Sequence, residues 1–248
     1  MATDPIQLDA AFEALAAYDW DRDAAPLATI DAAVVRTHGD AAQASDLERR
    51  FLTVVAGPSS RAAKEYACRK LSLVGTAAAV PALAALLADH DQSHMARFAL
   101  ERIPAAEAAE ALRQALGTVD RELAVGVISS LANRRDAASV ARLAELLGGD
   151  DDVAMAAAAA LGRIGTAAAA EALAAARPRP GAATSAVLDA RIACADALLA
   201  SGDRTAARQI FAALEAALPA RPQTHRERAL RVAVTSGGLA CLDDSVAP

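Results

Sequence analysis

Two histidines four residues apart come nearest, in this chain, to a metal-binding motif. The segment His90-Asp-Gln-Ser-His94 would place both imidazoles on one face of a helix, where they could hold Zn²⁺ with Asp89 or Asp91 beside them. The repeat described below places this segment between two helices, however, where the acids would cap a polar turn. Because further ligands are missing nearby, the pattern favours the turn, and we expect no metal or other cofactor.

Other charged or glycine-rich segments also have structural interpretations. The acidic run Asp150-Asp-Asp152 occupies the equivalent turn of a later unit, where acids favour a helix N-terminus. The basic segment from Arg221 to Arg231 could meet an acidic partner or nucleic acid, but a solvated amphipathic face is favoured. Gly162-Arg-Ile-Gly165 lacks the strand and the third glycine of a dinucleotide-binding loop. No local pattern pairs a nucleophile with a base, which weakens an enzyme hypothesis without removing it, because distant residues can meet.

Four stretches of the chain repeat one two-helix unit. They begin at Thr76, Ala105, Asp136 and Thr166, so the steps are 29, 31 and 30 residues. A leucine stands seven residues into each stretch, and another stands five residues before the start of the stretch. These leucines are Leu83, Leu112, Leu143 and Leu173, and Leu71, Leu100, Leu131 and Leu161. One such unit cannot bury its apolar face alone, so the period predicts a solenoid of stacked helical units.

Glycine and threonine mark the predicted helix boundaries. Gly75 and Gly165 fall just past one helix, where we expect a left-handed backbone, and Thr76 and Thr166 follow as N-caps of the next helix. Within each second helix, apolar residues at steps of four and three predict an inward face. The inward residues are Ala67, Leu71, Val74, Ala96, Leu100, Ile103, Val127, Leu131, Ala157, Leu161 and Ile164.

Composition favours an all-α fold and disfavours nucleic acid and membranes as partners. Apolar residues make up 54% of the chain but aromatic residues only 3%, and runs of alanine favour closely packed helices over strands. The net charge of -6 disfavours nucleic acid as a partner. Three scattered cysteines, Cys68, Cys194 and Cys241, indicate reduced thiols in a cytoplasmic protein. Without a signal segment or a long apolar stretch, we expect neither secretion nor a membrane partner.

The repeated register also resembles a known family. Within Tyr66 to Ala176, the pattern Ala-x-x-x-Leu-x-x-Val/Ile-Gly closes one helix, as in Ala157 to Gly165, before a short helix with leucine at its seventh position. This pattern resembles the HEAT-like repeats of bacterial proteins that are grouped with phycobilisome lyases. The resemblance implies an armadillo-like, right-handed α-α superhelix whose second helices line the concave side, and a scaffolding or partner-binding role. HEAT-like deoxyhypusine hydroxylase holds two irons with His-Glu pairs, and this chain has no His-Glu pair.

The pattern predicts four parts along the chain. Residues 1–57 are expected to form an irregular helical cap, and residues 58–177 the HEAT-like repeats. Residues 178–238 are expected to form helical hairpins, and residues 239–248 a flexible tail. Within the third part, Ala195 to Phe211 resembles one tetratricopeptide hairpin with Gly202 at its bend. A further helix from Thr224 to Thr235 is predicted to end at Gly237-Gly238.

The predicted partner-binding surface lies opposite the inward residues of the second helices. Apolar and cationic side chains there would line a shallow groove that accepts a partner helix or an extended segment. These residues are Phe98, Arg102, Val125, Ser129, Arg134, Met155 and Arg163, with Gly162 on the same face. An alternative that stays open is that Phe98, Val125 and Met155 only pack on adjacent helices.

Two functions remain open on the sequence. We expect a non-enzymatic, monomeric scaffold or adaptor that binds a protein partner through the concave face of the solenoid. The alternative is a subunit of a lyase or other enzyme, in which the repeats bind a substrate or a chromophore.

Overall fold

The fold is built from helices throughout the part of the chain that the structure describes. This computed structural model describes residues 5–178, 180–217 and 224–241, where every regular element is an α-helix or a short 3-10 helix. The all-α class predicted from the sequence is therefore confirmed. The chain separates into two units, unit 1 (Met1–Ser130) and unit 2 (Leu131–Pro248).

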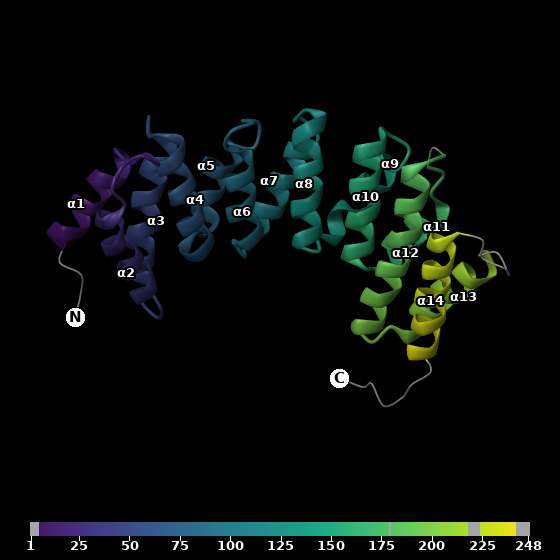
Figure 1. Cartoon of the computed structure of the whole chain (residues 1–248). Helices are drawn as coiled ribbons and strands as arrows, with labels where there is room; N and C mark the ends of the chain where they lie inside the picture. The colour runs from purple at the N-terminus through teal and green to yellow at the C-terminus, as the bar shows by residue number, and fades with distance from the viewer. Residues whose placement is uncertain (1–4, 179, 218–223, 242–248) are drawn as a thin grey trace. The chain divides into compact units, whose positions relative to one another are not determined.

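Unit 1 packs helices that are close in sequence (Figure 1). Its elements are α1 (Pro5–Ala16), η1 (Ala25–Leu27), α2 (Ala28–Arg36), α3 (Ala41–Ala56), α4 (Arg61–Val74), η2 (Ala77–Ala79), α5 (Val80–Ala84), α6 (Ser93–Arg102) and α7 (Ala106–Leu116). The helix α8 (Arg121–Asn133) begins in this unit and ends in the next. α3 packs against α4, α4 against α6, and α5 against α7.

Unit 2 is organised around α10 and α12. Its elements are η3 (Ala137–Ser139), α9 (Val140–Leu146), α10 (Asp151–Ile164), α11 (Ala167–Ala175), α12 (Ala182–Ala200), α13 (Arg204–Ala217) and α14 (His225–Ala240). α10 packs against α9, α11 and α12, and α13 packs against α12 and α14. Between α12 and α13, Gly202 has a φ of 91°, which confirms the predicted bend there.

The repeated leucines lie in the core of each unit. Every residue predicted to face inward on the second helices is buried, which confirms that part of the sequence pattern. Leu71 and Leu100 in unit 1, and Leu131 and Leu161 in unit 2, are all 0% exposed. Burial of one leucine side chain stabilises the fold by about 1.5 to 3 kcal/mol, so each repeated leucine contributes to the stability of its unit.

Threonine side chains begin two of the repeat units as predicted. The Thr76 hydroxyl accepts a hydrogen bond from the Ala78 N–H at the start of η2. The Thr166 hydroxyl accepts one from the Ala169 N–H at the start of α11. Each bond satisfies a backbone donor that has no partner inside its own helix, so both predicted caps are confirmed.

The two glycines before these caps differ in conformation. Gly165 has a φ of 64°, the left-handed conformation predicted for it. The same prediction is wrong for Gly75, whose backbone is extended with a φ of -70°. Glycine is needed at that position because a Cβ atom would collide with the Leu71 carbonyl oxygen. The requirement is for space, which a local sequence pattern does not distinguish from a requirement for positive φ.

The last helix extends past its predicted end. α14 continues through Gly237 and Gly238 to Ala240. A Cβ atom at Gly237 would overlap the ring of Phe211 on α13, so this glycine makes room for an aromatic side chain. A contact with another helix therefore explains a glycine that the sequence pattern assigns to a helix end.

Candidate functional site

Helices α10 and α12 approach each other closely because the residues at their contact are glycine and alanine. A Cβ atom at Gly162 would lie 2.7 Å from the Ala190 carbonyl oxygen, and one at Gly165 would overlap the Cβ atom of Ala197. Neither position accepts a larger side chain unless a helix moves. The prediction that Gly162 faces outward is therefore wrong, because α12 covers it.

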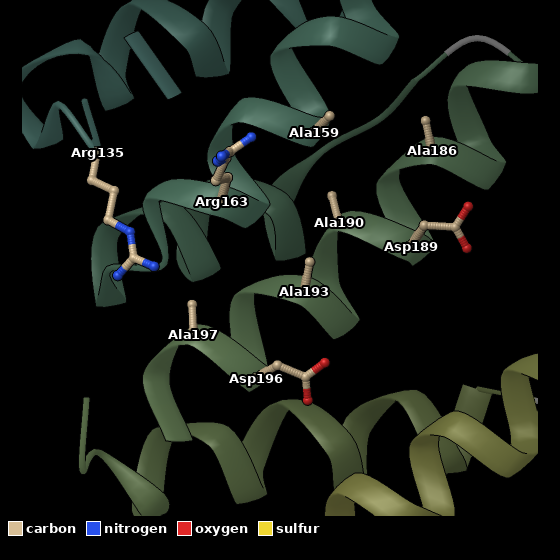
Figure 2. A pocket seen from close by; sticks show the side chains of 9 residues that line it. All are labelled: Arg135, Ala159, Arg163, Ala186, Asp189, Ala190, Ala193, Asp196 and Ala197. Carbon is tan, nitrogen blue, oxygen red and sulfur yellow. The ribbon is translucent and has the colours of Figure 1, made fainter. Parts of the chain in front are cut away.

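An open hollow with a volume of about 530 Å³ lies beside this contact, and we call it the α10–α12 groove. Its floor is formed by alanines on both helices (Figure 2). They are Ala159 on α10 and Ala186, Ala190, Ala193 and Ala197 on α12. The four α12 alanines are spaced by four, three and four residues, so they form one stripe along the helix.

Opposite charges border the α10–α12 groove. Arg135 and Arg163 lie on one side of the alanines, and Asp189 and Asp196 lie on the other side (Figure 2). The two aspartates are seven residues apart, which places them on the same flank of α12. The groove therefore has an apolar floor between a positive rim and a negative rim.

Three of these charged side chains are available to an incoming partner. Arg135, Arg163 and Asp196 are exposed, and none of their side chains makes a hydrogen bond or an ion pair with a described residue. Partial burial raises the pKa of the Asp196 carboxyl above its ordinary value, because the carboxylate loses part of its hydration. A cationic group placed beside Asp196 would offset that loss.

Four of the seven predicted partner-binding residues belong to unit 1. On α6, the Arg102 guanidinium lies 3.8 Å from the centre of the Phe98 ring and donates a hydrogen bond of 3.2 Å to the Phe98 carbonyl. On α8, Val125 is half-buried and Ser129 is exposed. The structure therefore joins Phe98 and Arg102 as a cation–π pair. Ser129 stands at the surface, as the pattern predicts.

The other three predicted residues belong to unit 2. Of these, Arg163 lines the α10–α12 groove, Met155 is half-buried on α10, and Arg134 follows the end of α8. Because the seven residues are divided between two units, one groove that contains them all stays a prediction.

Sequence reasoning missed the α12 side of the groove. The signal was present in the stretch from Ala182 to Ala200, where alanines recur at helical spacing and an aspartate recurs after seven residues. After an insertion of seven residues the register places Leu198 of this helix 37 residues beyond Leu161, but it does not show which neighbouring helix the alanine stripe contacts.

Arg97, in unit 1, is a half-buried cation. The Arg97 guanidinium on α6 rests against α8 at Gly126, where a Cβ atom would stand 2.6 Å from the Arg97 Nη2 atom. The Arg97 Nε atom is buried without a hydrogen-bond partner. Burial lowers the pKa of Arg97, and the charge of Glu101 acts in the opposite direction. In the sequence, Arg97 is one of several arginines scattered over the second helices.

The two histidines of the metal-like motif have different surroundings. His90 lies in the turn before α6, and its Nε2 atom is 2.6 Å from Asp120 Oδ2. His94 is exposed on the first turn of α6, while Asp91 pairs with Arg61 at 2.7 Å. In the described ranges, no three or more His, Cys, Asp or Glu side chains are grouped so that they could hold a metal ion.

The cysteines are buried and free. They are Cys68, Cys194 and Cys241. Burial raises the pKa of Cys68 to about 12 and that of Cys194 to about 11. Both of these thiols are therefore protonated near neutral pH, where a protonated thiol is a poor nucleophile.

The basic segment from Arg221 to Arg231 lies partly outside the described residues. In its described part on α14, Arg228 is exposed and Arg231 is half-buried. An acidic partner at this segment stays a prediction.

Comparisons with known proteins found no family model and no curated protein that matches the chain. Across the described residues, no helix combines the length and the apolarity that crossing a bilayer requires. Among the described residues, the α10–α12 groove joins an apolar floor to charged rims, and the proposal of function below is argued from it.

Proposed function

We propose that this chain is a non-enzymatic scaffold or adaptor that binds a protein partner, and that its repeats form a right-handed HEAT-like superhelix with the binding surface on its concave face. The regular burial of one leucine per repeat supports stacked units, because each unit then contributes the same contact to its neighbour. The α10–α12 groove is the observation that carries the binding role.

The chemistry of the groove suits a protein segment. An alanine floor lets a partner backbone come close, and alanine side chains lose little conformational entropy when they are covered. Rims of opposite sign match a polypeptide, whose side chains carry both charges. A nucleic acid would bring a phosphate backbone of one sign against Asp189 and Asp196, which would repel it.

Capture experiments with two tryptophan variants test this role. Ala193→Trp fills the groove at its floor, whereas Ala213→Trp adds the same side chain at an exposed position on α13 away from the groove. We expect a protein retained from native lysate by the wild-type chain and by Ala213→Trp to be lost with Ala193→Trp. Equal far-UV circular dichroism and melting curves would show that both variants fold. Equal retention by all three chains would contradict binding in this groove.

A further inference from the structure

The floor of the α10–α12 groove is suited to contact with one helix. Four alanines run along α12 over 12 residues, from Ala186 to Ala197, and Ala159 of α10 lies beside them. Ala193 is exposed and Ala186 half-buried, whereas Ala190 and Ala197 also pack against α10. That stretch covers about 16 Å at 1.5 Å per residue, or three turns of a docked helix. Because alanine projects only a methyl group, the axes of two helices can approach closely along such a stripe.

The rims add a direction-dependent charge pattern. Asp189 and Asp196 recur after seven residues, which is two turns, so a helix lying along α12 would meet them at matching intervals of seven. Arg135 and Arg163 would face the opposite flank of the docked helix. Each flank of the occupant therefore meets charge of one sign.

This inference rests on the proposed function and specifies the partner. We infer that the α10–α12 groove binds an amphipathic α-helix of another protein, with small apolar residues along its seam, basic residues at seven-residue spacing toward Asp189 and Asp196, and acidic residues toward Arg135 and Arg163.

Synthetic helical peptides test the charge pattern without knowledge of the natural partner. The patterned probe has about three heptads, with alanine and leucine on the seam, lysines along one flank and glutamates along the other. Exchanging the two flanks is no control, because the exchanged peptide could bind in the reverse direction. The matched control therefore has the same composition but alternates lysine and glutamate on each flank.

The patterned probe should bind the wild-type chain about tenfold more tightly than the alternating probe, with an advantage that shrinks as salt screens the rims. Fluorescence anisotropy at low and at physiological ionic strength measures this. A third probe carries prolines in its centre and cannot be helical. If the proline probe binds as well as the patterned probe, the occupant is extended and the inference fails.

Charge reversal in the protein supplies the complementary test. In Asp189→Lys/Asp196→Lys both rims are basic, so this variant should reject the patterned probe and bind a probe with glutamate on both flanks, which the wild-type chain should reject. Asp196→Lys alone should show about half of this change in binding free energy, and it keeps the test valid if the double variant does not fold. Glu171→Lys/Glu215→Lys changes the net charge equally at exposed positions outside the groove and should bind as wild type.

The outcomes separate this inference from the proposed function. If the patterned and alternating probes bind equally, while Ala193→Trp still abolishes partner capture, the charge-patterned helix is wrong as the occupant and the scaffold proposal stands. If the charge-matched control loses as much binding as the groove variants, the attraction is non-specific and the inference is wrong. If Ala193→Trp changes neither capture nor probe binding, both proposals fail.

Discussion

Unit 1 joins several neighbouring elements through polar side chains. Glu48 on α3 is only 5% exposed, and its carboxylate accepts hydrogen bonds from the Thr76 N–H at 2.6 Å and from the Thr76 hydroxyl at 3.0 Å. Asp31 on α2 accepts a hydrogen bond from the Tyr66 hydroxyl and pairs with Lys70, both at 2.6 Å. These contacts depend on charge and on hydrogen-bond geometry, and a side chain of another size or polarity would break them.

In unit 2, by contrast, helices come together at glycines, which have no side chain. Gly162 and Gly165 admit α12 against α10, and Gly237 admits the Phe211 ring of α13 against α14. Such contacts depend on volume and very little on ionisation. The two units should therefore differ in what disrupts them. Added side-chain volume should be decisive in unit 2, and protonation or the loss of a polar partner should be decisive in unit 1.

The largest effect is expected for Gly165→Val in unit 2. The new side chain would overlap Ala197 and would hold a β-branched residue at positive φ. Overpacking costs about 1 to 3 kcal/mol and a left-handed non-glycine residue about 1 to 2 kcal/mol, so the free energy of unfolding should fall by about 2 to 5 kcal/mol. Urea denaturation followed by circular dichroism measures the loss. Gly148→Val is the control, because no atom lies near a Cβ atom built at that glycine.

A smaller loss is expected for Glu48→Ala in unit 1. Removal of the carboxylate leaves the Thr76 N–H without its acceptor in a half-buried position, which costs about 1 to 3 kcal/mol. Glu48→Gln keeps an acceptor oxygen and should lose less. The same urea experiment compares the two variants, and equal losses would show that the charge of Glu48, rather than its hydrogen bonds, stabilises the contact.

The pH dependence of unit 1 should be weaker still, and it should depend on Asp31. Burial raises the pKa of Asp31, but hydrogen bonds from Lys70 and Tyr66 and the charge of Lys70 outweigh that effect, so the net pKa is lowered. A lowered pKa means that the stabilisation is present above the unfolded-state value of about 4 and is lost as the pH falls through the folded-state value.

Melting temperatures measured between neutral pH and acid test this expectation. The Asp31→Asn variant should melt at a lower temperature than the wild type at neutral pH. Below about pH 4, its melting temperature should fall less steeply with pH than that of the wild type. Asp21→Asn, at an exposed carboxylate without a hydrogen bond to a described residue, should keep the wild-type slope. If Asp31→Asn keeps that slope as well, this cluster does not contribute to acid sensitivity.

These contrasts also show how much of the molecule the sequence could predict. The inward leucines, the threonine caps and the bend at Gly202 were predictable, because each depends on spacing or on backbone preferences within a few residues. The role of Gly162 was not predictable in the same way. Its reason lies about thirty residues later, in Ala190, and a single sequence does not show which helices meet.

The candidate site was predictable on one side only. Arg163 stands on a regular second helix and was identified, whereas Asp189 and Asp196 stand after the insertion, on a helix for which the register predicts the inward Leu198 but no groove. The charge pattern on α12 can be recognised in the sequence once it is known that α12 packs against α10. Tertiary packing therefore decides which of several amphipathic stripes becomes a groove.

The smallest effect is expected for Gly126→Ala in unit 1, although Gly162→Ala in unit 2 is nominally the same change. At Gly162 the new methyl group meets the backbone of Ala190, so a helix must move, and overpacking should cost about 1 to 3 kcal/mol. At Gly126 it meets the tip of the Arg97 side chain, which can rotate into solvent. Replacing a helical glycine by alanine gains about 0.5 to 1 kcal/mol, which should offset the lost packing and leave the free energy of unfolding nearly unchanged.

A double variant separates these two contributions at Gly126. Arg97→Ala removes the guanidinium, so that Gly126→Ala in this background should show only the gain in helix propensity. Urea denaturation of the wild type, both single variants and the double variant gives the coupling between the two positions. A coupling near zero would mean that the methyl group and the guanidinium never compete for space. A loss for Gly126→Ala as large as that for Gly162→Ala would mean that Arg97 is held rigidly against α8, and the two glycines would then be equivalent.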